Sequence, residues 1–293
     1  MINLAIIGGG PAGYTAAEKA SKGGMDVVLF EQDTLGGTCL NVGCIPTKTL
    51  LYSAKQYYNA TNATKYGVTA QSVQFDYAKI AQRKTKVVRK LVAGIKQKLN
   101  NEHCQVIKGF AQVLSRTDEK VIIRCGEETY EAENLLICTG STNFVPPIPG
   151  VKDNPAVWDS TDALAATQLP ESMIIVGGGV IGMEFATLYH ELGLPVTVIE
   201  AMPNILPNLD QEVVTILLDK YRKAGIQILT ETKVTEIQGN KVITTNGEYE
   251  AEHILISVGR RANLNGLEAL NDLEMYRGGI VVDDMMRTNL KNV

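Results

Sequence analysis

The sequence predicts an α/β protein with two domains, each built in three layers around a central parallel sheet. The pattern Gly-x-Gly-x-x-Gly occurs twice, at residues 8–13 and 177–182. Each copy directly follows an apolar run, and a second apolar run ending in a glutamate comes after it. This order of strand, glycine loop, helix, strand and acidic residue is typical of Rossmann-like dinucleotide-binding folds.

The first copy starts with an apolar run over residues 2–7, which predicts a buried parallel strand. Small residues over 12–20 predict a helix that packs closely on the sheet, and residues 27–30 predict the next strand. The first glycine permits a tight turn, the second lets the backbone approach a pyrophosphate, and the helix N-terminus supplies N–H donors. A carboxylate after the second strand can accept a hydrogen bond from a ribose hydroxyl. The predicted dinucleotide contacts are Gly8, Gly10, Gly13 and Glu31.

The second copy repeats this pattern with predicted strands over 173–176 and 196–199 and a predicted helix over 180–192. Its acidic residue, Glu200, repels a 2′-phosphate, and residues 201–219 contain no Lys or Arg to accommodate one. The second site is therefore predicted to prefer NAD to NADP. The predicted contacts are Gly177, Gly179, Gly182 and Glu200.

Composition excludes several other classes of protein. The chain has 293 residues, a net charge of −4 and 45% hydrophobic residues, which suits about two ordinary domains. The acidic balance disfavours nucleic-acid binding, and no apolar run reaches the roughly 20 residues that span a membrane. A strand that starts at Ile2 leaves no room for a signal peptide, so we expect a cytoplasmic location. The basic helix predicted over 75–100 is interpreted as a solvated face.

The predicted domains are residues 1–145, 146–262 and a partial return to the first domain over 263–293, so that the second domain is inserted in the first. The boundary at 145/146 rests on the proline-rich stretch 146–150, which is a plausible linker. The apolar run over 254–259 ends in glycine, as does the run over 135–140, and one further strand is predicted over 280–282.

Two of the five cysteines lie close together among glycines, at Cys39 and Cys44. In a regular helix, residues five apart have Cα atoms about 8–9 Å apart, which is beyond the roughly 7 Å limit for a disulfide. A bond between them therefore needs a distorted helix start, which Gly43 permits, and a helix N-terminus stabilises thiolate. Two neighbouring free thiols remain the alternative. The other three cysteines, Cys104, Cys125 and Cys138, are interpreted as small buried apolar residues, and no metal site is predicted.

The stretch GGTCLNVGCIPTK over 36–48, the two glycine loops and GRRAN over 259–263 closely resemble the class I flavin-dependent pyridine nucleotide-disulfide oxidoreductases. Within that family they are most similar to dihydrolipoamide dehydrogenases. The resemblance covers essentially the whole chain. It implies FAD on the first loop, in a FAD-binding domain over 1–145, NAD on the second, in an NAD-binding domain over 146–262, and a redox-active disulfide between Cys39 and Cys44.

The resemblance also implies roles for individual residues. Cys39 matches the interchange thiol, and Cys44 matches the charge-transfer thiol nearest the flavin. Lys48 matches a lysine at the flavin ring that pairs with a glutamate, here Glu184; a solvated helix lysine and an ordinary first-turn carboxylate are the alternatives. Further implied contacts are Thr38, Ala111, Thr139, Gly140 and Ser141 for FAD, and Val180, Glu184, Val234 and Gly259 for NAD.

The activity implied is oxidation of dihydrolipoamide by NAD through the cysteine pair and FAD, in a ping-pong sequence and with a role in cell redox homeostasis. The implied partner is a small dithiol or disulfide, or a lipoyl domain. Glutathione- or mercuric-reductase-like enzymes that use NAD(P)H are alternatives within the class. A non-catalytic fragment that binds FAD and NAD is the alternative of another class.

The chain departs from the family pattern at its C-terminal end. Val293 stands where a second flavin motif and a dimerisation domain with a His–Glu pair are expected to follow, and the parent protein is expected to be a homodimer. The three histidines, His103, His190 and His253, are interpreted as structural. We therefore expect a truncated chain that is impaired in turnover.

Overall fold

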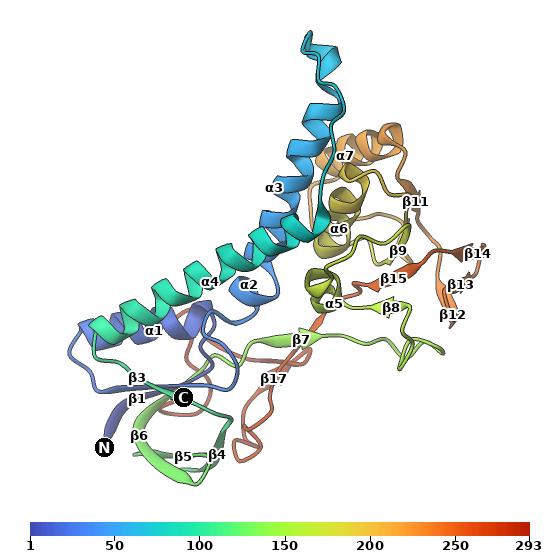
Figure 1. Cartoon of the computed structure of the whole chain (residues 1–293). Helices are drawn as coiled ribbons and strands as arrows, with labels where there is room; N and C mark the ends of the chain where they lie inside the picture. Colours follow the sequence, from blue (N-terminus) through green and yellow to red (C-terminus); the bar gives the residue numbers. More distant parts are fainter. The chain divides into compact units, whose positions relative to one another are not determined.

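The computed structural model describes residues 1–293, and its contacts divide the chain into two units (Figure 1). The first unit contains residues 1–45, 87–142 and 261–293, and the second contains residues 46–86 and 143–260. Residues 46–86 thus group with the second glycine loop, although they follow the first loop in the chain. The domain boundaries predicted from the sequence stay predictions.

The first unit is built on a six-stranded sheet in the order β3-β2-β1-β6-β5-β4. The strands β3, β2, β1 and β6 run parallel, and β5 and β4 extend the sheet as an antiparallel hairpin. The bounds are β1 (Ile2–Ile7), β2 (Val27–Glu31), β3 (Gln105–Lys108), β4 (Ala111–Arg116), β5 (Val121–Cys125) and β6 (Glu128–Ile137).

Successive residues of β1 enter two different cores, as expected of a strand buried on both faces. Ile6 packs with Ala17 of helix α1 (Pro11–Lys22) and with Leu99 of helix α4 (Tyr77–Asn101). Ala5 and Ile7 lie in the other core, which also contains leucines of the C-terminal segment such as Leu290. The first glycine loop therefore extends from the central strand of a sheet that is covered on both sides.

The second unit has a parallel sheet in the order β11-β10-β9-β15-β8. Its bounds are β8 (Val157–Trp158), β9 (Met173–Val176), β10 (Val196–Ile199), β11 (Gln227–Leu229) and β15 (His253–Ile256). An antiparallel sheet of β12 (Val234–Gln238), β13 (Lys241–Thr244) and β14 (Gly247–Glu250) packs on one face through Ile237 and Val242.

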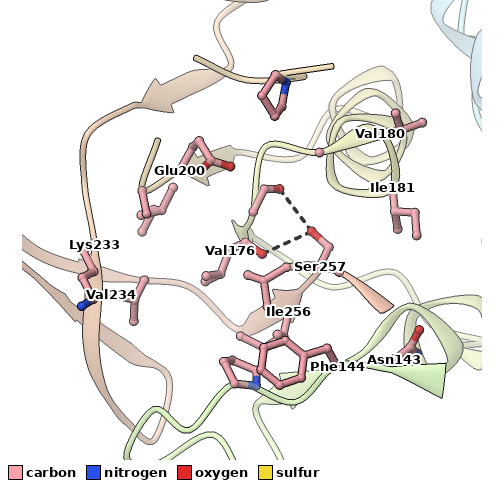
Figure 2. A pocket seen from close by; sticks show the side chains of 18 of the residues that line it. Asn143, Phe144, Val176, Val180, Ile181, Glu200, Lys233, Val234, Ile256 and Ser257 are labelled. Carbon is pink, nitrogen blue, oxygen red and sulfur yellow. Dashed lines mark hydrogen bonds between the residues drawn. The ribbon is translucent and has the colours of Figure 1, made fainter. Parts of the chain in front are cut away.

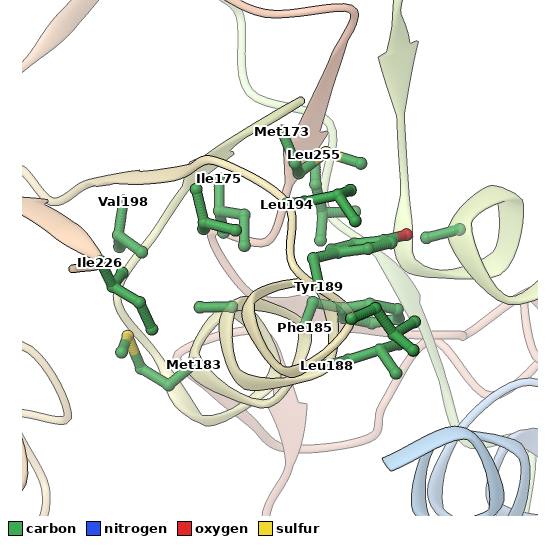
Figure 3. Packing of buried hydrophobic residues seen from close by; sticks show 14 of the residues in the cluster. Met173, Ile175, Met183, Phe185, Leu188, Tyr189, Leu194, Val198, Ile226 and Leu255 are labelled. Atoms are coloured by element: carbon green, nitrogen blue, oxygen red, sulfur yellow. The ribbon is translucent and has the colours of Figure 1, made fainter. Parts of the chain in front are cut away.

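Helices cover the other face of this sheet (Figure 3). Phe185, Leu188 and Tyr189 of α6 (Val180–Glu191) pack with Met173 and Ile175 of β9, and all are almost fully buried. This core also includes residues of α3 (Cys44–Thr61), α5 (Ser160–Ala165) and α7 (Gln211–Ala224). The predicted α/β class with parallel sheets is confirmed.

Most predicted elements occur with small shifts at their ends. The strands predicted over 2–7, 173–176 and 196–199 have those bounds, and the predicted helix over 75–100 is α4. The strand predicted over 280–282 is the short β18 (Gly279–Ile280), which pairs with β17 (Met275–Tyr276). The remaining elements are α2 (Gly37–Asn41), the 3-10 helix η1 (Ala63–Tyr66), β7 (Ser141–Asn143) and β16 (Arg260–Ala262). No helix is both long and apolar enough to cross a membrane.

Candidate functional site

The first glycine loop has room for glycine only at two of its three positions. Gly8 has φ +107°, and a Cβ there would lie 2.1 Å from the carbonyl oxygen of Cys138. A Cβ on Gly13 would lie 1.8 Å from the carbonyl oxygen of Gly8. At Gly10, the N-cap of α1, the nearest atom would be 3.7 Å away. The loop is therefore tightly packed toward the sheet and open where the helix begins, as an anion-binding turn requires.

The second glycine loop has the same construction. Gly177 has φ +110°, and a Cβ on Gly182 would lie 2.1 Å from the carbonyl oxygen of Gly177. Gly179 is the N-cap of α6, and a Cβ there would meet no heavy atom within 4 Å. The free N–H groups of the first turn of α6 therefore border open space.

Each predicted acidic residue is held by the glycine loop beside it. Glu31 accepts hydrogen bonds from the backbone N–H of Gly9 and of Asp33, both at 2.8 Å. Glu200 accepts from the N–H of Gly178 and of Met202, both at 2.7 Å. A carboxylate has about four lone-pair positions, so each can still accept from a ribose hydroxyl. That role stays a prediction, but the structure orients both carboxylates for it.

A cavity of about 770 Å³ opens beside the second loop, wholly within the second unit (Figure 2). Sequence reasoning missed several of its wall residues, because they come from segments far from the fingerprint: Asn143, Phe144, Leu206, Lys233 and Ser257. No local pattern marks these positions. The predicted residues that line it are Gly177, Gly179, Val180, Glu200, Val234 and Gly259.

Ser257 connects the cavity wall to the loop backbone. Its hydroxyl lies 3.2 Å from the carbonyl oxygens of both Val176 and Gly177, to which it donates (Figure 2). A Cβ on Gly182 would lie 2.7 Å from this hydroxyl oxygen. Ser257 therefore restrains the turn that carries the first glycine of the fingerprint.

Glu184 does not line the cavity but forms an ion pair with Lys48. The Lys48 Nζ lies 2.5 Å from Oε1 of Glu184, which joins α3 to α6 inside the second unit. The lysine side chain is 57% exposed and the glutamate side chain 26%. The pairing expected from the resemblance is therefore present, while a role at a flavin stays a prediction.

The two closely spaced cysteines lie in different helices. Cys39 is half-buried in α2, and Cys44 is exposed as the first residue of α3. The chain leaves helical geometry at Val42, whose φ is −139°, and a Cβ on Gly43 would lie 2.8 Å from the carbonyl oxygen of Thr38. This break is the departure from a regular helix that a disulfide between them requires. The disulfide itself stays a prediction.

The other three cysteines lie in less reactive surroundings. Burial raises the pKa of the Cys104 thiol and raises that of Cys138 to about 11. Burial also raises the pKa of Cys125, with Glu128 adding to the effect. Cys104 and Cys125 are buried as predicted, whereas Cys138 is only half-buried. At neutral pH these three remain thiols, and thiols are poor nucleophiles.

The remaining residues expected at a flavin belong to the first unit. Ala111 is buried as the first residue of β4, Thr38 lies in α2, and Ser141 begins β7. The backbone N–H of Asn263 donates to the carbonyl oxygen of Gly140 at 2.9 Å, and its side chain donates to that of Thr139 at 3.4 Å. Asn263 therefore holds the turn after β6, a role that the GRRAN motif contained but that we did not assign from the sequence.

His190 and His253 are half-buried, whereas His103 is exposed. His190 lies in α6, where burial lowers its pKa. His253 stacks on Trp158 with ring centroids 3.7 Å apart, and its Nδ1 lies 3.3 Å from the carbonyl oxygen of Ala156. His103 directly precedes Cys104 and β3 with φ +54°. The contacts of His190 and His253 fit structural roles, and the interpretation of all three histidines as structural stays a prediction.

Comparisons with known proteins agree with this geometry. The chain is 41% identical to a dihydrolipoyl dehydrogenase of Acholeplasma laidlawii over 99% of its own length and 87% of the relative's. It is 36% identical to the dihydrolipoyl dehydrogenase of Bacillus subtilis, of which it spans 66%. Six further dihydrolipoyl dehydrogenases are covered to about the same extent, 63–65%.

Solved structures share the fold. The HOCl-induced flavoprotein disulfide reductase RclA of Escherichia coli superposes with a TM-score of 0.86 at 32% identity, over 99% of this chain and 64% of RclA. LpdA of Mycobacterium tuberculosis gives a TM-score of 0.89 at 25% identity, over 100% of this chain and 66% of LpdA. A family model described as pyridine nucleotide-disulphide oxidoreductase matches residues 2–293. The chain belongs to the pyridine nucleotide-disulphide oxidoreductase family.

Proposed function

We propose that this chain carries the electron-transfer machinery of a flavoprotein that oxidises a dithiol of the dihydrolipoamide type with NAD. The observation that carries the proposal is the helix α3, which begins with Cys44 and holds Lys48 in its ion pair with Glu184. Two glycine loops of the same construction accompany it. The names of the relatives point to the same chemistry.

The first loop fits FAD. The open side of Gly10 and the N-terminus of α1 suit the pyrophosphate, because a Cβ there meets nothing closer than 3.7 Å. Glu31, already oriented by Gly9, would accept from the ribose. FAD bound there supplies an isoalloxazine ring that takes up two electrons from thiols and gives them to a nicotinamide. The other residues assigned to it are Gly8, Gly13, Thr38, Lys48, Ala111, Thr139, Gly140 and Ser141.

The second loop and its cavity fit NAD. Glu200 lines the cavity with its carboxylate fixed by Gly178 and Met202, so a 2′-phosphate there would meet a negative charge. Residues 201–219 contain no Lys or Arg, but Lys233 lines the same cavity and brings a positive charge to it. We assign NAD because Glu200 stands directly after β10, where the ribose hydroxyls of a dinucleotide bind in this fold.

The cysteines exchange electrons with the substrate in two displacements. A substrate thiolate attacks Cys39 Sγ, the Cys39–Cys44 bond breaks, and Cys44 leaves as a thiolate. The second substrate thiolate then attacks the substrate sulfur of the mixed disulfide and releases Cys39. The substrate leaves as a cyclic disulfide, two electrons remain on the cysteine pair, and the two substrate protons are released. Lys48 lies about one helical turn after Cys44, where its positive charge stabilises the negative charge of the Cys44 thiolate.

The test is an anaerobic titration of the FAD-loaded chain with NADH, followed in the visible spectrum. We expect a long-wavelength charge-transfer band to appear as NADH is added, because the electrons pass through the flavin to the Cys39–Cys44 disulfide and leave Cys44 as a thiolate. C44S should show no such band, and C39S, which has no disulfide to accept the electrons, should keep them on the flavin and lose the flavin absorbance. NADPH should act much more weakly. A chain that binds NADH without reduction of flavin is a binding fragment, and preferential reduction by NADPH with turnover of glutathione disulfide favours a glutathione-reductase-like enzyme. Either result refutes the proposal.

A further inference from the structure

Helix α4 carries a concentration of positive charge that the proposed function does not use. It contains no Asp or Glu, in a chain whose net charge is −4. The rest of the chain is therefore strongly acidic. Lys79, Arg83, Lys86 and Lys90 follow one another at spacings of four and three residues, which places them on one helical face. The cationic residues of α4 are Lys79, Arg83, Lys84, Lys86, Arg89, Lys90, Lys96 and Lys98.

A second cavity adjoins the first part of this face. It measures about 420 Å³ and lies between α3, the segment 73–76 and the first turns of α4, all within the second unit. Figure 1 shows the chain returning along α3 before α4 begins. Tyr57 and Phe75 pack edge to face with ring centroids 4.7 Å apart and contribute an apolar wall. We call this cavity, together with Tyr52, Arg83 and Lys86, the α3–α4 groove.

The cation best placed to bind a partner is Arg83. Its Nη1 donates to the carbonyl oxygen of Thr49 at 3.2 Å, and its guanidinium carbon lies 5.6 Å from the ring centroid of Tyr52. The arginine is thus positioned before any partner arrives, which reduces the entropy lost on binding. Tyr52 is 59% exposed. Tyrosine and arginine are both enriched among the residues that contribute most to the energy of protein interfaces.

The groove favours polypeptide over other anionic partners. Ser53, Gln56 and Gln74 line it with groups that both donate and accept hydrogen bonds, as peptide bonds do. Asp76 also lines it, 3.4 Å from the Lys79 Nζ, and a continuous phosphate backbone would meet this carboxylate. Binding to a bilayer would require large apolar side chains beside the cations. The other residues on the cationic face of α4 are Gln82, Ala93 and Gln97, none of which is large and apolar.

We propose that the α3–α4 groove docks an acidic polypeptide segment. The charge of the segment complements Arg83 and Lys86, and its backbone meets the polar side chains of the groove. Tyr52 lies eight residues after Cys44 on α3, about 12 Å along the helix axis, so a docked segment lies on the helix that begins with the exposed thiol. The proposal does not rest on the proposed function, because it concerns binding alone.

The test measures binding of a short fluorescein-labelled peptide, in which Glu alternates with Ser and Gly, by fluorescence anisotropy at low salt. R83E/K86E should weaken binding about tenfold or more, and R83Q/K86Q should weaken it less. The matched control K152E/K223E makes the same change in net charge at exposed lysines of the same unit outside the groove. It should leave binding within about twofold.

Two controls keep the result interpretable. Urea unfolding of each variant, followed through the fluorescence of Trp158, should match that of the wild type if the unit folds normally, whichever way the proposed function stands. Equal loss of peptide binding in R83E/K86E and K152E/K223E would overturn the proposal, since it would show attraction without a site. The proposal would also be overturned if the wild-type chain did not bind the peptide but bound duplex DNA or phosphatidylglycerol vesicles, and if R83E/K86E lost that binding.

Discussion

The two glycines Gly179 and Gly182 should respond in opposite ways to a single methyl group. An alanine Cβ at Gly182 would lie 2.1 Å from the carbonyl oxygen of Gly177 and 2.7 Å from the hydroxyl oxygen of Ser257. The backbone oxygen must therefore move by about 1 Å to reach an ordinary contact. Overpacking of this kind costs about 1–3 kcal/mol of unfolding free energy. At Gly179 the φ is −73°, and the added methyl meets nothing within 4 Å.

G182A should therefore lower the stability of the second unit, while G179A should change it by no more than about 0.5 kcal/mol. The new methyl of G179A borders the cavity beside the helix N-terminus, where a pyrophosphate must approach the backbone. We expect it to weaken NADH binding at least about tenfold, or about 1.4 kcal/mol. Stability and binding are thus separated by two substitutions three residues apart.

The assay uses the single tryptophan, Trp158, which lies in β8 of the second unit. Urea unfolding followed by its fluorescence reports stability, and its quenching by NADH reports binding. Wild-type stability in G182A would show that the contacts with Gly177 and Ser257 do not restrict this position. Wild-type NADH affinity in G179A would show that the dinucleotide does not approach this turn, and the assignment of the cavity would then fail.

Three further predictions concern other parts of the chain. In the first loop, G13A should lose stability and FAD binding, because its Cβ would lie 1.8 Å from the carbonyl oxygen of Gly8. G10A should fold normally, and thermal unfolding followed by circular dichroism will compare the stability of the two variants. Asp159 caps α5, and D159A should lower the free energy of unfolding by about 1 kcal/mol at neutral pH. Burial raises the pKa of Asp159, but hydrogen bonds from Asn143 and from backbone N–H groups lower it by more, so the pKa lies below its usual value. Because the folded pKa lies below the unfolded value, that difference from D159A should vanish as pH falls below about 4, and D159N should remove the pH dependence. Burial lowers the pKa of His190, so the unfolded chain binds a proton first and stability should fall as pH drops below about 6.5; urea titrations of H190Q should lack this slope.

The glycine loops could be predicted from the sequence because the steric constraint is local. A tight turn with positive φ at its first glycine leaves no room for a side chain there, and the helix that follows begins at once. The flanking strands are short apolar runs buried on both faces, and their bounds over 2–7 and 173–176 agree with the structure. Spacing along the chain carries all of this information.

The cavity walls could not be predicted in the same way. Phe144, Leu206 and Lys233 come from three separate segments that meet only after the sheet has formed. Lys233 lies beyond the stretch that directly follows Glu200, so a prediction of NAD from local charge could not include it. Likewise, helical spacing predicted α4 but could not show that its first turns and α3 group with the second unit.

The repeat is close in backbone geometry but differs at one position in chemistry. Cys138 and Ser257 occupy equivalent places in the two copies. The backbone N–H of Cys138 donates to the carbonyl oxygen of Ile7 at 2.8 Å, and that of Ser257 donates to the carbonyl oxygen of Val176 at 2.8 Å; each acceptor directly precedes the first glycine of its loop. The Ser257 hydroxyl also donates to the loop carbonyls. A thiol is a weak donor, and the raised pKa of Cys138 keeps it protonated. The second loop is therefore restrained by a side-chain hydrogen bond where the first relies on packing, a difference that the glycine pattern alone does not reveal.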